Sequence, residues 1–217
     1  MDEMIPAVIR DNKYFMYPFY KIWFSGMDLK SLMEFKSKAH CMSEGEFRDL
    51  YSLIGDKHNK RESDLNDSSL KYIMDSLDRG SKSLLDAGCG NGYFIKKISR
   101  FGYDLHGCDL MSIQPENYKF TRTSIENLPF ADKQFDIVVC NHTLEHVIHI
   151  DKAVSELKRV TKKQLIITVP CQRYFRYTLD LHLHFFPLKS MLEGLVNIQN
   201  HFCQKLDGDL VYIGYPH

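Results

Sequence analysis

The sequence lacks the cysteine pairs, the long apolar runs and the charge excess that mark several classes of protein. Its six cysteines form no Cys-x-x-Cys pair, which argues against a zinc or redox motif of that type. Four of them lie in or just after apolar runs, a placement that favours reduced, buried thiols over a disulfide framework: Cys89, Cys108, Cys140 and Cys171. No stretch approaches the roughly 18 uninterrupted apolar residues of a transmembrane helix, so no membrane span is expected.

The chain also lacks an overall charge. Its 28 Lys and Arg balance 28 Asp and Glu, so the basic surface that binds long nucleic acid is not expected, and a small molecule is the expected partner. Residues 1–10 carry acids and a proline without an apolar core, which predicts no signal peptide and a cytoplasmic location. The oligomeric state is not predicted by the sequence.

With 217 residues and 44% hydrophobic content, the chain is long enough for one full domain. Residues 1–80 read as helices: an aromatic cluster over 14–20 precedes helical spacing, a capping box predicts a helix over 43–53, a polar loop follows over 55–67, and a third helix begins near Asp67. We therefore expect an N-terminal helical lid over residues 1–80 that caps the substrate.

From residue 83 the pattern changes to alternating strands and helices. Strands are predicted over 83–87, 104–110, 118–125, 135–140 and 164–169, with helices over 93–101 and 149–161. This alternation predicts an α/β fold with a parallel sheet and helices on both faces. Asp207-Gly208 is a strong hairpin signal between 196–206 and 209–213, so the domain over 81–217 is expected to end in an antiparallel hairpin.

A glycine-rich turn follows the first predicted strand. Gly88, Gly90 and Gly92 would let the backbone approach a ligand closely, and the following helix would offer free N–H groups to an anion. Asp109 ends the next strand, 19 residues after Gly90, where a carboxylate can bind both hydroxyls of a ribose. The pattern therefore predicts a site for a nucleoside-containing cofactor.

Two classes of cofactor bind at such a turn: dinucleotides, and nucleosides that carry no pyrophosphate. A dinucleotide site of the Gly-x-Gly-x-x-Gly type needs glycine where this chain has Tyr93, and that side chain would crowd a pyrophosphate. The observed spacing is Gly-x-Gly-x-Gly, preceded by Asp86. A glycine-rich turn without any ligand is the remaining alternative.

Residues 84–92, Leu-Leu-Asp-Ala-Gly-Cys-Gly-Asn-Gly, resemble the first motif of the class I S-adenosylmethionine-dependent methyltransferases. Residues 124–130, 135–147 and 165–170 resemble further motifs of that family in order and spacing. The resemblance covers about residues 80–175. It implies a Rossmann-like, seven-stranded, mostly parallel sheet with a terminal antiparallel hairpin, and S-adenosylmethionine as the cofactor, with S-adenosylhomocysteine as the product.

The resemblance also assigns cofactor contacts by position. The turn would pass against the amino-acid part of the cofactor, Asp109 would hold the ribose, Leu110 would pack on the adenine, and the polar residues after the fourth strand would lie near the methionine end. Many relatives have Asp where Ser124 stands, so that adenine contact is expected to differ. The implied cofactor residues are Asp86, Gly88, Cys89, Gly90, Gly92, Asp109, Leu110, Ser124, Ile125, Asn141 and His142.

Residues 142–146, His-Thr-Leu-Glu-His, are the first candidates for catalysis, because methylation of a hydroxyl needs a general base or a metal. His142 or His146 could be the base, or His142, Glu145 and His146 could bind a divalent ion, or the segment packs without chemistry. Some related quinone and small-RNA methyltransferases bind an ion with a Glu, Glu, His set. This chain has His142 at the first position, which disfavours magnesium. A zinc peptidase motif would need a helix here, whereas a strand end is predicted.

Residues 180–186, Asp-Leu-His-Leu-His-Phe-Phe, are the second catalytic candidates. They follow the fifth strand, and ligands of α/β sheets bind beyond the carboxyl ends of strands. The stretch resembles part of methyltransferases from polysaccharide and natural-product pathways. His182 or His184 could act in the active site, or both alternate with apolar neighbours on a half-buried extended segment.

These features together predict methyl transfer from S-adenosylmethionine to an oxygen of a small metabolite or sugar, such as a nucleotide sugar. The alternatives are an RNA or protein methyltransferase, a nucleoside-binding module without catalysis, and a nicotinamide oxidoreductase. The sequence does not name the acceptor or the methylated atom.

Overall fold

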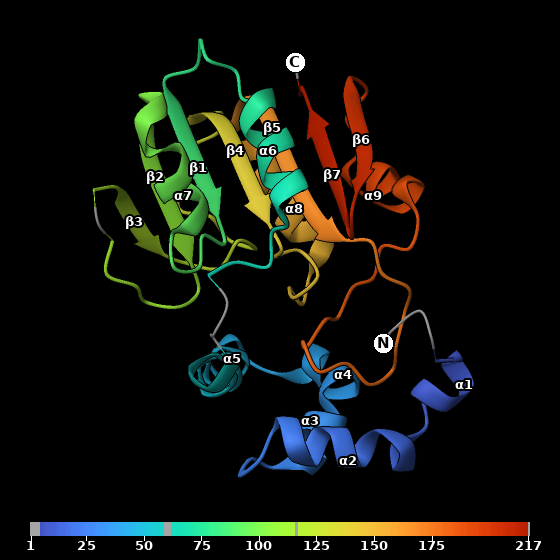
Figure 1. Ribbon diagram of the computed structural model, residues 1–217. Helices are drawn as coiled ribbons and strands as arrows, with labels where there is room; N and C mark the ends of the chain where they lie inside the picture. The colour runs from blue at the N-terminus through green and yellow to red at the C-terminus, as the bar shows by residue number, and fades with distance from the viewer. Residues whose placement is uncertain (1–4, 59–61, 116, 217) are drawn as a thin grey trace.

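A seven-stranded sheet forms the centre of the protein, whose computed structural model describes residues 5–58, 62–115 and 117–216 (Figure 1). The strand order is β3-β2-β1-β4-β5-β7-β6. All pairs are parallel except β5 with β7 and β7 with β6. The strands are β1 (Ser83–Ala87), β2 (Asp104–Asp109), β3 (Lys119–Arg122), β4 (Phe135–Asn141), β5 (Thr161–Pro170), β6 (His201–Leu206) and β7 (Asp209–Gly214). The predicted fold class is confirmed.

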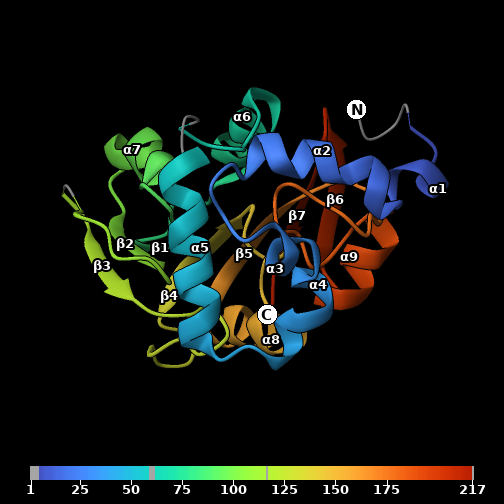
Figure 2. The ribbon, with the colours of Figure 1, turned by 90° about the horizontal axis from the view of Figure 1, so that it is seen from below.

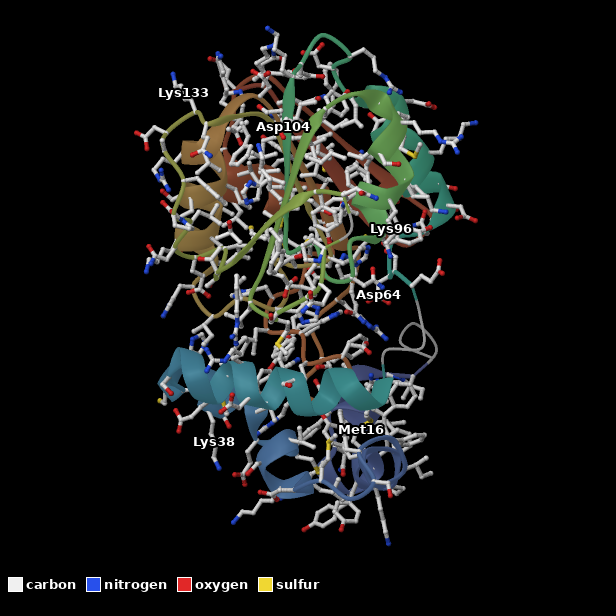
Figure 3. The ribbon with its side chains drawn as sticks, turned by 90° about the vertical axis from the view of Figure 1, so that its left-hand side faces the viewer. Met16, Lys38, Asp64, Lys96, Asp104 and Lys133 are labelled. Carbon is white, nitrogen blue, oxygen red and sulfur yellow. The ribbon has the colours of Figure 1, made fainter. Side chains whose placement is uncertain are left out.

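Helices cover both faces of this sheet. α6 (Asp67–Ser76), α7 (Tyr93–Ile98) and the 3-10 turn η2 (Ser99–Phe101) lie on one face, and α8 (Ile150–Val160) and α9 (Lys189–Val196) lie on the other (Figure 1). Alternate residues of β1 serve the two faces, since Leu84 packs with α6 and α7 while Leu85 packs with α8 and α9. Figure 3 shows the same division, with Lys96 and Lys133 on opposite sides of the sheet.

A third layer of helices lies beneath the carboxyl ends of the parallel strands (Figures 1 and 2). We call this layer the cap. Its elements are α1 (Ala7–Arg10), α2 (Lys13–Trp23), α3 (Leu29–Met33), α4 (Phe35–Lys38), the 3-10 turn η1 (Ala39–Cys41) and α5 (Glu44–His58). Side-chain caps fix where its helices begin: Asn12 starts α2, Asp28 starts α3, and the predicted box of Ser43 with Glu46 starts α5.

The cap is joined to the rest of the protein through the segment 171–188, which runs from β5 to α9. Arg10 Nη1 donates to the Tyr177 carbonyl at 2.8 Å, and the Tyr20 hydroxyl donates to the Thr178 carbonyl at 2.7 Å. The apolar core of the cap also contains Tyr177 and Leu181 of this segment. The segment is therefore held between the sheet and the cap.

Several element boundaries differ from the sequence expectations; β5, for example, begins at Thr161 and not at 164. Residues 55–58 of the polar stretch expected as a loop are helical, because α5 continues to His58. β3 is limited to Lys119–Arg122 because it is an edge strand that pairs only with β2. Val196 ends the unpredicted helix α9, so the first hairpin strand begins at His201 and not at Val196.

All six cysteines are free thiols, as expected, although Cys171 is only half-buried. Among the described residues, no helix combines the length and apolar character that a membrane crossing requires.

Candidate active site

The turn between β1 and α7 has the backbone geometry that only glycine adopts easily. Gly88, Gly90 and Gly92 have φ values of 79°, 50° and 76°. A Cβ on Gly88 would lie 2.2 Å from Thr143 Oγ1, so glycine is also required sterically. The N–H groups of Gly88 and Cys89 both donate to the Cys108 carbonyl, at 2.8 and 3.0 Å. The turn is thus fixed against the end of β2.

Asp109 lies at that end of β2 and binds the turn directly. Its Oδ2 accepts the Gly90 N–H at 2.9 Å, and its Oδ1 accepts the Met111 N–H at 2.9 Å. Burial raises the pKa of Asp109, while these N–H donors lower it. Burial also raises the pKa of the neighbouring Asp86 to about 7, and the charge of Asp109 adds to this shift. Backbone N–H groups thus stabilise the charged form of Asp109, the carboxylate that contacts the turn.

The segment 124–128, which is expected to contact adenine, is held in place by burial and by hydrogen bonds from α8. Ile125 and Leu128 are buried, and Ser124 Oγ accepts the Glu126 N–H at 3.2 Å. Arg159 of α8 donates to the carbonyl of Leu128 at 2.9 Å and to that of Phe130 at 2.6 Å. These contacts fix the backbone of the segment. The predicted contacts of this segment and of the half-buried Leu110 with adenine stay predictions.

Two polar residues end β4. Both side-chain polar atoms of Asn141 are buried and have no hydrogen-bond partner among the described residues; such atoms are costly unless a ligand binds them. His142 has a φ of 48° and lies between two carboxylates, with Nδ1 3.3 Å from Glu145 Oε1 and Nε2 3.3 Å from Asp209 Oδ1. Burial lowers the pKa of His142, but Asp209 and Glu145 raise it more, to about 10. His142 is therefore an imidazolium at neutral pH and not a free base.

On the other side of Glu145 lie two more histidines. His146 Nε2 is 3.9 Å from Glu145 Oε1, and the rings of His146 and His182 are 4.7 Å apart. Burial lowers the pKa of His146 to about 4, so its ring is neutral. One ligand atom from each of Glu145, His146 and His182 lies within 4.8 Å of the others. The structure thus brings together candidates from both motifs, 142–146 and 180–186.

His184 lies outside this cluster. Its Nε2 is 2.8 Å from the Val147 carbonyl, to which it donates, and burial lowers the pKa of its ring. The N–H groups of Leu183 and His184 both donate to the Glu145 carbonyl, at 2.7 and 3.0 Å. His184 thus ties the segment 171–188 to the end of β4, and its catalytic role stays a prediction.

Four residues that surround these groups are not among the predicted site residues, although Gln172 lies in the stretch 171–177 that leads from the fifth strand to the second candidates. Tyr51 of α5 places its hydroxyl 2.5 Å from His146 Nδ1, and Gln172 places Oε1 3.0 Å from His182 Nδ1. Asp209 of β7 contacts His142, and Asn66 donates to Asp209 at 2.7 Å. None of them lies in a motif. Only the position of Gln172 just after a parallel strand could have indicated it.

Parts of this chain are similar to known proteins. Residues 85–168 match the family described as "Methyltransferase domain". A malonyl-[acyl-carrier protein] O-methyltransferase of Buchnera aphidicola is 37% identical over 87 residues, which are 37% of this chain and 35% of that protein. A ubiquinone biosynthesis O-methyltransferase of Hahella chejuensis is 27% identical over 150 residues, 63% of this chain and 58% of that protein. The chain thus covers less than two thirds of either relative.

A solved structure shows the same fold. It is a methyltransferase from Thermotoga maritima described as S-adenosylmethionine-dependent, with a TM-score of 0.55 and 17% sequence identity. The likeness covers 69% of this chain and 88% of that one.

Proposed function

We propose that this chain, whose residues 85–168 match the methyltransferase domain family, is a class I S-adenosylmethionine-dependent methyltransferase and transfers a methyl group from S-adenosylmethionine to an oxygen of a small molecule. The observation that carries the proposal is the glycine turn held by Asp109 through the Gly90 N–H. That arrangement places a carboxylate beside a turn with room for a ligand, since a Cβ on Gly90 would meet nothing within 4 Å.

The residues present fit the cofactor. The turn from Gly88 to Gly92 would hold its amino-acid part, and the remaining lone pairs of the Asp109 carboxylate would accept the ribose hydroxyls. Asn141 would satisfy its unpartnered buried amide against the methionine end. The bound cofactor supplies an activated methyl group on a sulfonium, and the protein must align the acceptor and exclude water.

A hollow beyond β5 supports a small-molecule acceptor. Its volume is about 490 Å³, and Pro170, Gln172, Arg173 and Lys205 are among the residues that line it. This size is usual for sites that bind small molecules. The two cationic residues suit an acceptor with a phosphate or carboxylate, such as a nucleotide sugar. The named O-methyltransferases among the relatives support oxygen as the methylated atom.

An acceptor hydroxyl must also lose its proton. His142 is already charged, and His146 is a weak base because its pKa is about 4. Of the catalytic candidates near β4 and β5, His182 remains, and Gln172 Oε1 contacts its Nδ1 at 3.0 Å. We assign proton removal to His182, which lies beside Glu145 and His146. His182→Ala is expected to lower turnover more than cofactor affinity.

Calorimetric titration with S-adenosylmethionine and, separately, with NAD tests the cofactor. We expect binding of the first alone, weakened at least about tenfold in Asp109→Ala through loss of a charge-assisted contact. Asp104→Ala is the matched control, since Asp104 begins the same strand and forms an exposed ion pair with Lys119. Unchanged affinity in Asp109→Ala would refute the ribose assignment, and preferential binding of NAD would favour an oxidoreductase. A screen of small acceptors against RNA and protein substrates then tests the acceptor class.

A further inference from the structure

A second hollow lies between the cap and the segment 171–188, which descends from β5 toward α4 in Figure 1. Its volume is about 410 Å³, within the range of sites that bind small molecules. The segment forms one wall, and its residues alternate: Arg173 and Phe175 line the hollow beyond β5, whereas Tyr174 and Arg176 line this one. The two hollows therefore lie on opposite sides of the same stretch of chain.

Positive charge gathers in this second hollow. Three cationic side chains line it: Lys13 of α2, Lys36 of α4 and Arg176 of the segment. The acidic lining residue Glu34 already pairs with Lys38, at 2.7 Å. Neither Lys13 nor Arg176 forms an ion pair with any residue that the structure describes. Like charges at a concave surface raise the local potential, so this hollow attracts anions.

Lys36 is the least exposed of the three cations. It is half-buried, with Nζ 4.1 Å from the centroid of the Phe185 ring, and it donates to the Phe175 carbonyl. Burial, with the charge of Arg10, lowers the pKa of Lys36 to about 7 against the opposing effect of Asp11. An anion in the hollow would stabilise the charged amine. Anion binding is therefore coupled to protonation of Lys36.

We propose that this hollow binds the phosphate groups of a small organic phosphate, such as a nucleoside diphosphate, through Lys13, Lys36 and Arg176. A guanidinium group can bind two phosphate oxygens at once, and an ammonium group supplies a compact charge with three donors. A volume of about 410 Å³ leaves room for more than an inorganic ion. The cations therefore suit the phosphates, and the remaining space suits the organic part.

The bound phosphate would also act on the hollow beyond β5. Phe175 lines that hollow, and its carbonyl accepts the hydrogen bond from Lys36. A charged amine forms a stronger hydrogen bond than a neutral one. The ligand would therefore hold one wall of the proposed acceptor site more firmly. This consequence rests on the proposed function, whereas phosphate binding itself does not.

The test uses the full chain with carbon-labelled lysine and inorganic pyrophosphate as the probe. Nuclear magnetic resonance follows the Lys36 side chain across neutral pH, and its signal is identified as the one lost in Lys36→Met. We expect pyrophosphate to raise the pKa of Lys36 from about 7, because the anion stabilises the charged amine. Sulfate keeps its charge across this range, so the same rise with sulfate separates the effect from ionisation of the probe.

Variants of exposed cations locate the probe without disturbing the fold, which circular dichroism checks. Arg176→Gln should raise about tenfold or more the pyrophosphate concentration that gives half of the Lys36 response, through loss of a charge-assisted contact. Lys13→Gln should act in the same direction. Lys21→Gln removes an equal charge from α2 outside the hollow, and Lys205→Gln removes one from the hollow beyond β5. Both controls should respond like the wild type.

A pKa of Lys36 that moves with neither anion overturns the site. A response that Arg176→Gln leaves unchanged, or that Lys205→Gln abolishes, overturns it as well. Titration of the same samples with S-adenosylmethionine separates the two proposals, because a chain that binds pyrophosphate at Lys36 without binding the cofactor refutes only the proposed function.

Discussion

Replacing Gly88 by alanine tests the glycine turn quantitatively. Gly88 has a φ of 79°, and a left-handed conformation costs alanine about 1–2 kcal/mol. The new Cβ would also lie 2.2 Å from Oγ1, 2.4 Å from Cγ2 and 2.8 Å from Cβ of Thr143. Overpacking of this kind costs about 1–3 kcal/mol. We therefore expect Gly88→Ala to lower the free energy of unfolding by about 2–5 kcal/mol.

The two contributions can be separated with variants of the same chain. Gly102 has a φ of 85°, and a Cβ there would meet nothing within 4 Å, so Gly102→Ala should show the backbone cost alone. Thr143→Ala removes two of the three overlapping atoms, so the double variant with Gly88→Ala should recover part of the packing cost.

Urea unfolding of these variants measures the free energies, and calorimetry measures the affinity for S-adenosylmethionine. Affinity should fall with Gly88→Ala and stay near wild type with Gly102→Ala. If Gly88→Ala were no more destabilising than Gly102→Ala, or if Thr143→Ala gave no recovery, the packing described for the turn would be wrong.

Two further predictions concern Lys36 in the cap and the support that Arg159 gives to residues 124–130. Burial lowers the pKa of Lys36 to about 7 from 10.5, so between these values the unfolded chain binds a proton that the folded chain does not, and stability should rise with pH across that window. Urea unfolding over this pH range should show the rise in the free energy of unfolding. The rise should disappear in Lys36→Met and remain in the control Lys38→Met, because the Lys38 side chain is half exposed. A rise that persists in Lys36→Met would contradict the assignment. Arg159→Lys gives up the paired donation to Leu128 and Phe130, so stability should fall by about 1–3 kcal/mol and cofactor affinity should fall with it; an unchanged affinity would show that the segment does not depend on Arg159.

The sheet and the cofactor turn were predictable because local signals coincide with the fold there. Apolar runs mark the strands, and Gly88, Gly90 and Gly92 stand where the backbone has positive φ. Asp109 was predictable from its spacing, and it does bind the turn. α9 was missed because Leu188, at its N-cap, gives no side-chain signal for the start of a helix, although Asn197 ends it in the left-handed conformation.

The surroundings of the histidines could not be predicted because they depend on contacts between distant segments. Tyr51 and His146 are 95 residues apart in sequence, and the hydroxyl of Tyr51 carries no motif. Asp209 looked like part of a hairpin turn, yet its contact with His142 helps to raise the pKa of that histidine to about 10. Sequence spacing places residues at strand ends, whereas charge and orientation come from the packing of the cap and the last strands.

Side chains of the cap donate hydrogen bonds to the main chain of the segment 171–188. Arg10 and Tyr20 donate to the carbonyl groups of Tyr177 and Thr178, and Lys36 donates to that of Phe175. Every amino acid supplies the same carbonyl group, so these three hydrogen bonds do not depend on which side chains the segment carries, whereas the packing of Tyr177 and Leu181 in the core of the cap does. Substitutions elsewhere along the segment can reshape the hollow beyond β5 while these hydrogen bonds keep the helices attached, so the proposed acceptor site can change on an unchanged frame.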